Sequence, residues 1–395
     1  MATARITREV GLPDPIKLER YRRSPDLGPK ILFFSGGTAL RRTARELTRY
    51  THNSIHVVTP FDSGGSSAKL RKTFRMPAVG DVRSRLMALS DQSILGNPEI
   101  FALFAHRMSQ NALIQDLQGE LERMSRGRHP LVASIPDPMR KIIRNHFRDF
   151  IERMGDFDLR GASIGNIVLT AGYLTNRRHL DPVIFLFSKL VQVLGVVRPV
   201  VNANLHLAAE LESGEVVIGQ HRMTGKEAAP LASRIDRIWL TRSLDDPAST
   251  EASIRAKMRE RILGADLICY PMGSFFTSVI ANLLPKGVGK AIAGNRCPKV
   301  FIPNTKPDPE LFGYGLADQV EILLRTLLAD SKVSNPRNVL DFVLVDTTNG
   351  PGLERRELSQ IQELGFEVLD LPLISAQSSP LIDEKLLVPI LLSLA

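Results

Sequence analysis

Short apolar runs that end in Gly, Ser or Asp recur along the chain and predict buried strands of a parallel sheet. Residues 30–35 form one run before Gly36-Gly37, and residues 55–59 form a second run before Asp62. Such bounded runs are typical of strands covered on both faces. Apolar residues then recur at helical spacing over 38–50 and 81–89. This strand, turn, helix, strand order predicts an α/β fold with a doubly wound, mostly parallel, Rossmann-like sheet.

The middle of the chain has a different pattern. Amphipathic periodicity predicts helices over 98–117 and 139–154, within a helical insertion at about 92–155. Asp181-Pro182 is typical of an N-cap and first helical position, and Gly195 of a helix end. Residues 205–211 alternate and return over 216–218 after Ser213-Gly214, which predicts a small β-hairpin element, at the sheet edge or as a small subdomain.

Parallel strands are expected again at 266–270, 299–302 and 341–345, each bounded by turn residues. We therefore expect residues 30–395 to form a single α/β domain, with a C-terminal lobe at about 332–395. Residues 1–29 are expected to form a basic N-terminal arm that carries charges of both signs. With 395 residues and 43% apolar composition, the chain can bury a large core.

Location is predicted from what the sequence lacks. No run approaches the roughly 20 apolar residues of a membrane span, and the first thirty residues lack the apolar centre of a secretory signal. The two cysteines, Cys269 and Cys297, lie outside any CxxC pair and are expected as buried thiols. These features predict a cytoplasmic protein without a membrane partner.

The net charge of +9 indicates an anionic partner. Nucleic acid, an anionic membrane surface and phosphorylated small molecules are the three classes to weigh. Aromatic residues make up only 6% and do not alternate with the basic ones, so nucleic acid ranks last. The basic residues crowd the Gly-rich segments, which favours phosphorylated small molecules.

Five Gly-rich turns, most at predicted strand ends, are the candidate sites. The first, at Gly36, Gly37 and Thr38, suits either a phosphate near a helix N-terminus or a plain turn. The second, residues 62–67, offers glycines and hydroxyls to a phosphate and the Asp62 carboxylate to Mg²⁺. The alternative for this second turn is a solvated loop.

The other three turns carry similar alternatives. Asp81 in the segment 80–83 also suits a helix cap. Ser163 and Asn166 lie in an apolar stretch, where their polar atoms need partners such as a ligand. Gly273 and Ser274 follow a predicted strand and suit a phosphate or a plain turn. Each motif is weak by itself.

In order and spacing, however, the motifs together resemble the CofD/YvcK superfamily over about residues 30–390. The matching segments are SGGTAL (35–40), FDSGGSSAKLR (61–71), AVGDVR (78–83), ALSD (88–91), GASIGN (161–166), YPMGSFFTSVIANLL (270–284) and the segment 304–310. The superfamily includes 2-phospho-L-lactate transferase and YvcK-type proteins, often called gluconeogenesis factors, which bind UDP-sugars.

The resemblance implies a nucleotide or nucleotide-sugar ligand, and one reading is a transferase. It would move a phosphate-ester group from a nucleoside diphosphate donor to an acceptor hydroxyl, with Asp62 as catalytic base or Mg²⁺ ligand. Lys69, Arg71 and Arg83 would offset phosphate charge. The residues expected at the ligand are Gly36, Gly37, Thr38, Gly64, Gly65, Ser66, Ser67, Lys69, Arg71, Asp81, Arg83, Ser163, Asn166, Gly273, Ser274 and Asn304.

The alternative is a non-catalytic regulator of the YvcK type, which binds a UDP-sugar and signals through a protein partner. It is prompted by Ser63, which stands where the family pattern has a second acid. Ala39, Ala78, Ala162 and Met272 also depart from that pattern. The resemblance further implies a homodimer.

Overall fold

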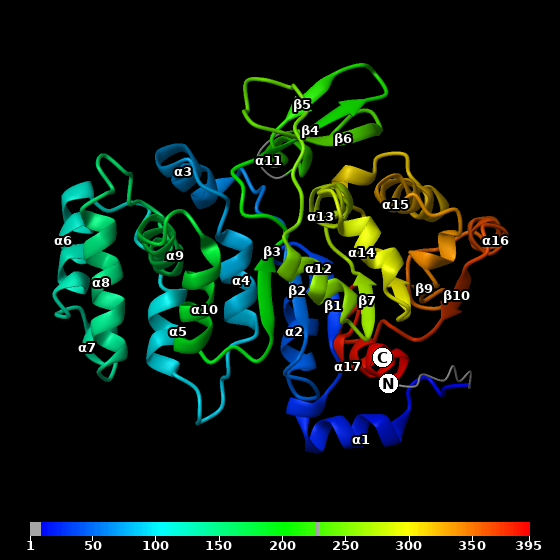
Figure 1. Ribbon diagram of the computed structural model, residues 1–395, viewed down its shortest axis with the longest axis horizontal. Coiled ribbons are helices and arrows are strands. Elements are labelled where there is room, and N and C mark those ends of the chain that lie inside the picture. The colour runs from blue at the N-terminus through cyan, green and yellow to red at the C-terminus, as the bar shows by residue number, and fades with distance from the viewer. Residues whose placement is uncertain (1–8, 226–228) are drawn as a thin grey trace.

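A seven-stranded, wholly parallel sheet forms the centre of the protein in this computed structural model, which describes residues 9–225 and 229–395 (Figure 1). The sheet confirms the predicted doubly wound fold. Its strands, in order across the sheet, are β10 (Glu367–Asp370), β9 (Phe342–Val345), β8 (Lys299–Phe301), β7 (Leu267–Tyr270), β1 (Ile31–Ser35), β2 (Ile55–Val58) and β3 (Val196–Pro199).

The two strands that the sequence pattern did not predict, β3 and β10, are the edge strands. Edge strands are short and partly exposed, so they lack a continuous apolar run. Arg198 and Pro199 interrupt β3, and Glu367 and Asp370 lie at the ends of β10.

The central strand β1 supplies both cores because its side chains alternate between the two faces. Ile31 and Phe33 pack against α2 (Arg41–Leu47) and α17 (Glu384–Leu394). Leu32 and Phe34 belong to the larger core on the opposite face. The helices that contribute to that larger core are α12 (Ala256–Leu263), α13 (Ala281–Leu283), α14 (Val288–Gly294), α15 (Leu316–Ser331) and α16 (Arg355–Glu363).

A separate helical core lies beside β3, at the left of Figure 1. Its helices are α3 (Gly65–Phe74), α4 (Gly80–Ala88), α5 (Pro98–Ala105), α6 (Ile114–Ser125), α7 (Pro130–Ala133), α8 (Met139–Ile151), α9 (Ile164–Thr175) and α10 (Leu180–Leu190).

Two expectations about these helices were wrong. The periodic segment 98–117 is two helices, because the chain leaves the helix at His106 to pair Arg107 with Ser163 and to bond the Met108 amide to the Ala162 carbonyl. Asp181 is not an N-cap. Helix α10 begins two residues earlier than expected, at Leu180 with His179 as its N-cap, and it ends at Leu190, so Gly195 is not its stop.

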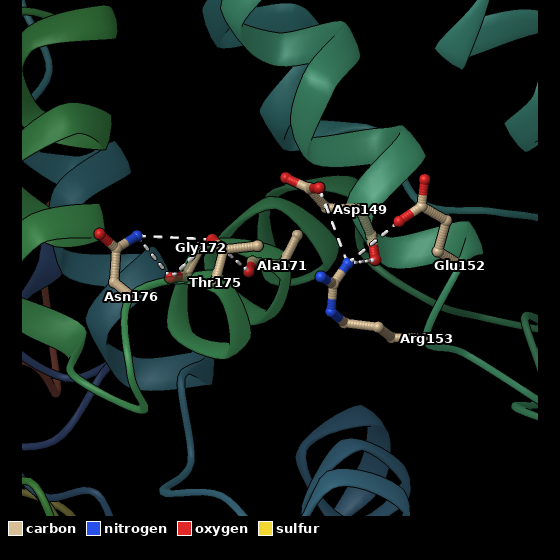
Figure 2. A network of polar contacts seen from close by, with 7 residues as sticks. All are labelled: Asp149, Glu152, Arg153, Ala171, Gly172, Thr175 and Asn176. Atoms are coloured by element: carbon tan, nitrogen blue, oxygen red, sulfur yellow. Dashed lines mark hydrogen bonds and ion pairs between the residues drawn. The ribbon is translucent and has the colours of Figure 1, made fainter.

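Side chains close the ends of α8 and α9 (Figure 2). Arg153 donates to the Asp149 carbonyl oxygen at 2.9 Å and forms ion pairs with the Asp149 and Glu152 carboxylates. Asn176 and Thr175 both donate to the Gly172 carbonyl oxygen. These contacts satisfy carbonyl groups that a helix end leaves without a partner.

The predicted hairpin is confirmed as part of a small antiparallel sheet of three strands, in the order β5-β4-β6. These strands are β4 (His206–Leu211), β5 (Val216–Ile218) and β6 (Ile235–Thr241), with α11 (Gln220–Met223) following β5. Figure 1 shows this sheet apart from the large one, beyond the carboxyl ends of its central strands. The strand β6 was missed because Asp236 and Arg237 are exposed and break the alternation.

Part of the predicted arm is helical. Helix α1 (Pro15–Arg23) lies against α17, where the Asp14 amide donates to Ser393 Oγ and Lys17 Nζ donates to the Ser393 carbonyl oxygen. The arm's first eight residues lie outside the described part of the chain. Among the described helices, none has the length and apolarity that a membrane crossing requires.

Candidate functional site

Two Gly turns meet at the centre of the large sheet, where β1 has β2 on one side and β7 on the other. Ligands of doubly wound sheets bind at such a switch in strand order, outside the carboxyl ends. A Cβ atom on Gly36, after β1, would lie 2.5 Å from Ser278 Oγ. A Cβ atom on Gly273, after β7, would lie 3.6 Å from Ala39 Cβ. The two turns are therefore in contact.

The turn after β1 is held by α4. A Cβ atom on Gly37 would lie 2.3 Å from Asp81 Oδ1, so only glycine fits there. One helical turn after Asp81, the fully buried Arg85 donates to the Gly36 and Leu40 carbonyl oxygens at 2.9 and 3.0 Å. Burial lowers the pKa of Arg85 to about 10, and the Asp81 charge opposes this change. The exposed Thr38 follows on the rim.

The loop after β2 approaches the same place. Asp62 Oδ1 accepts the Gly64 amide at 3.0 Å, and α3 begins at Gly65. A Cβ atom on Gly80, the first residue of α4, would lie 2.7 Å from Ser67 Oγ and 3.5 Å from Asp62 Oδ2. The start of α3 therefore lies against the start of α4.

Helix α9 joins them through its own first turn. Asn166 Nδ2 donates to Ser66 Oγ at 3.4 Å. A Cβ atom on Gly165 would lie 2.8 Å from Arg83 Cδ. The N-termini of α3, α4 and α9 thus converge, and their partial positive charges favour an anion.

Several polar atoms at this convergence lack partners. Ser163 Oγ, Asn166 Oδ1 and Arg83 Nε are buried without a hydrogen bond. Burial lowers the pKa of Arg83 to about 10, and the neighbouring cations Arg107 and Arg41 lower it further. None of these three arginines forms an ion pair within the described ranges. The site therefore combines three neighbouring arginines with unsatisfied polar groups.

The other two predicted cations are engaged within the protein. Lys69 Nζ donates to Asp158 Oδ2 at 2.9 Å and to the Arg160 carbonyl oxygen. The buried Arg71 donates to Asn204 Oδ1 and to the carbonyl oxygens of Phe61, Asp62 and Leu205. Arg71 thus ties the loop after β2 to the start of β4. A ligand role for Lys69 or Arg71 stays a prediction.

At the turn after β7, side chains of the protein itself accept hydrogen bonds from the backbone amides. Gly273 N donates to Asn304 Oδ1 at 2.8 Å, and Phe275 N donates to Asp308 Oδ2 at 2.8 Å. The fully buried Glu310 accepts the Phe276 and Thr277 amides at 2.9 and 2.8 Å. Burial and the Asp308 charge raise the pKa of Glu310 to about 8.

These contacts show that Asn304 and its neighbours shape the Gly273-Ser274 turn. Asn304 also lines a cavity of about 380 Å³ at the carboxyl ends of β8 and β9. For Gly273, Ser274 and Asn304, contact with a ligand stays a prediction.

The residues around Asp62 do not form a complete metal site by themselves. Ser63, which replaces the second acid, is buried and its hydroxyl lies 2.9 Å from His221 Nδ1. In the described ranges no group of three or more His, Cys, Asp or Glu is placed to hold a metal. Mg²⁺ in proteins is usually held by one or two carboxylates together with waters and substrate phosphates, so Mg²⁺ at Asp62 stays a prediction.

Sequence reasoning missed several residues that build the site. Arg85 stands four residues after Asp81, and this helical spacing was the available signal. Asn282, whose Nδ2 donates to the Ser35 and Ser278 carbonyl oxygens, lies within the quoted segment 270–284. No local signal marked Arg41, Arg107 or His221, because only the fold brings them close to Arg83 or Ser63.

Comparison with known proteins places this arrangement in a family. A family model described as 2-phospho-L-lactate transferase CofD matches residues 31–377. The gluconeogenesis factor of Bacillus subtilis is 28% identical over 347 residues, which cover 87% of each chain. A putative gluconeogenesis factor of Nostoc is 30% identical over 80% of this chain and 55% of its own.

Solved structures agree in fold. A crystal structure of a UPF0052-family protein from Bacillus halodurans superposes with a TM-score of 0.67 at 24% identity, covering 92% of this chain and 99% of that one. The family match spans all seven strands of the large sheet and the segments 36–38, 62–67, 80–83 and 161–166 beside it, and the chain therefore belongs to the CofD family.

Proposed function

We propose that the crevice between β1, β2 and β7 binds a nucleotide-sugar, and that the protein is a ligand-binding regulator that signals through a protein partner. The observation that carries this proposal is the set of unpaired groups at the meeting point of α3, α4 and α9. Arg83 Nε, Ser163 Oγ and Asn166 Oδ1 are buried without hydrogen bonds. Buried polar atoms of this kind need partners. Arg83 Nε and Ser163 Oγ can donate to the acceptor oxygens of a diphosphate, whereas Asn166 Oδ1 can accept from a hydroxyl or N–H group of the ligand.

The ligand's charge is balanced by the protein itself in this proposal. Arg83 lies near Arg41 and Arg107, whose positive charges lower its pKa. A bound diphosphate relieves this repulsion, and guanidinium groups suit phosphate oxygens because they donate several hydrogen bonds in one plane. In this proposal binding does not require Mg²⁺, because the arginines offset the charge of the ligand.

The Bacillus subtilis relative is named a gluconeogenesis factor, which supports a regulatory role. The replacement of the second acid by Ser63 supports the same role. The Ser63 hydroxyl lies against His221 and accepts its backbone amide at 3.3 Å, so it fixes the loop to α11. It thereby links the ligand loop to the small β-sheet.

The test is a thermal-shift and calorimetric screen with UDP-N-acetylglucosamine, UDP, GDP, GTP and ADP, each with and without Mg²⁺. A ligand at a hundred times its dissociation constant adds about 2.7 kcal/mol to the free energy of unfolding. We expect a UDP-sugar to stabilise the protein equally in Mg²⁺ and in EDTA. Arg83→Met should weaken binding by about tenfold, roughly 1.4 kcal/mol. Arg42→Met, an exposed neighbour on α2, is the matched control.

A second function, phosphate-ester transfer, is favoured by one observation. The Asp62 carboxylate lies at the crevice, 3.5 Å from where a Cβ on Gly80 would stand, and the family model is described as a transferase. In this second proposal Asp62 takes the proton from an acceptor hydroxyl. A guanine nucleotide that requires both Mg²⁺ and Asp62 in the screen would favour the transferase over the regulator. If no nucleotide binds, both functions are wrong.

A further inference from the structure

A basic groove follows the edge strand β3, and its end at Asn204 and Leu205 lies next to Arg71. It consists of three adjoining cavities of about 1060, 470 and 360 Å³. Arg255 lines the first and the third, whereas Lys257 and Arg261 line the first and the second. Helices α10 and α12 form its two sides, on either side of β3 in Figure 1. The groove is thus long and open.

Positive charge dominates the largest of these cavities. Five cations line it, and the two acids that also line it are Asp181 and Glu251. Asp181 pairs with Arg198 at 3.3 Å, and Glu251 pairs with Lys286 outside the groove. The cations that remain without an ion pair in the part of the chain described here are Arg242, Arg255, Lys257 and Arg261.

The floor and one rim of the groove are apolar. Val200 and Met258 are buried in the floor, whereas Phe185 is 58% exposed at the rim on α10. An apolar floor with charged sides suits an extended peptide, whose side chains alternate between the two. Sites for single-stranded nucleic acid use several aromatic side chains as stacking surfaces, and this groove has one.

The free edge of β3 is poorly suited to pair with another strand. Pro199 has no N–H group, and Arg198 Nη1 covers the Val197 carbonyl oxygen at 2.8 Å. Proline and charged side chains on an edge strand are known devices against strand pairing. Recognition in the groove therefore rests on its side chains.

We propose that this groove binds an extended acidic segment of a protein partner, with apolar side chains between its acids. The acids contact Arg242, Arg255, Lys257 and Arg261, and the apolar side chains cover the floor beside Phe185. This site is distinct from the nucleotide crevice, and the proposal holds whether or not a nucleotide-sugar binds there.

The experiment is a displayed library of random peptides, selected on the full-length protein. The peptide that is most enriched is then made with a fluorescent label, and its binding is followed by anisotropy. Lys257→Glu is the test variant, and Arg259→Glu is its control, because both residues are exposed on α12 and only Lys257 lines the groove.

We expect an acidic consensus with apolar residues between the acids, and about a tenfold loss of affinity in Lys257→Glu but not in Arg259→Glu. Affinity should also fall as salt is added. Failure to enrich acidic peptides would overturn the proposal, as would equal binding to both variants. Displacement of the peptide by an oligothymidylate that itself binds more tightly would assign the groove to nucleic acid instead.

Discussion

The turns after β1 and β7 look alike in sequence and differ in the structure. Both follow a buried strand, both contain glycine, and both precede a helical segment. After β7, the amides of Gly273, Phe275 and Phe276 are taken by Asn304, Asp308 and Glu310. Around the turn after β1, buried atoms of Arg83 and Ser163 remain without partners.

In our proposal, this difference marks the region beside β1 as the ligand site. Natural proteins satisfy nearly all buried polar groups, so a cluster of unsatisfied ones requires an explanation. At the turn after β7, three side chains from the segment 304–310 accept the backbone amides. Beside β1, Arg83 Nε and Ser163 Oγ remain without partners and could donate hydrogen bonds to a phosphate.

The largest effect should come from Glu310→Ala, which removes the internal cap of the β7 turn. The Phe276 and Thr277 amides would be buried without partners, at a cost of about 1–3 kcal/mol each. We therefore expect the free energy of unfolding, measured with urea, to fall by about 3 kcal/mol. A loss below about 1 kcal/mol would show that the cap is dispensable.

The Glu310 carboxyl also predicts how the stability of the protein depends on pH. Its pKa is raised from 4.5 to about 8 in the folded protein. Between these values the folded state holds a proton that the unfolded state has lost, so stability falls as pH rises across the window and levels above it. Glu310→Gln should remove this decline. The measurement is urea unfolding of both proteins at several pH values from about 5 to 8.

The next effect concerns the connection between the crevice and the small sheet. Arg71→Met removes every hydrogen bond from the guanidinium to the Phe61, Asp62 and Leu205 carbonyl oxygens. We expect the free energy of unfolding of Arg71→Met to fall by about 2 kcal/mol. Proteolysis should be faster in Arg71→Met than in Lys72→Met, the exposed control. If Arg71→Met keeps its stability and loses only ligand binding, Arg71 belongs to the ligand site.

The smallest effects are expected from a matched pair of substitutions, each of which removes one buried hydroxyl group beside one of the two turns. Thr277→Val removes a hydrogen bond to Glu310 and should cost about 1 kcal/mol. Ser163→Ala removes a buried hydroxyl without a partner, so stability should stay within about 0.5 kcal/mol or rise slightly. Ligand affinity should fall only in Ser163→Ala. Equal costs in stability would mean that the two turns do not differ as described.

The sequence by itself determined the order of the central strands along the chain, the Gly turns at their ends and the family. Apolar runs of β1, β2, β7, β8 and β9 were visible because both faces of these strands are buried. Residues 161–166 were recognisable as a candidate site segment, since glycines and polar groups within an apolar stretch are unusual.

Only the tertiary structure decided which of these segments keep polar groups that are not hydrogen-bonded within the protein. Arg71 and Arg83 are both arginines in quoted motifs, yet Arg71 is saturated by carbonyl oxygens and Arg83 is left beside Arg41 and Arg107. Contacts between residues far apart in the chain, such as Ser63 with His221 and Gly273 with Asn304, leave no local pattern. The edge strand β3 and its basic groove also depend on packing, because a partly exposed strand has no continuous apolar run to reveal it.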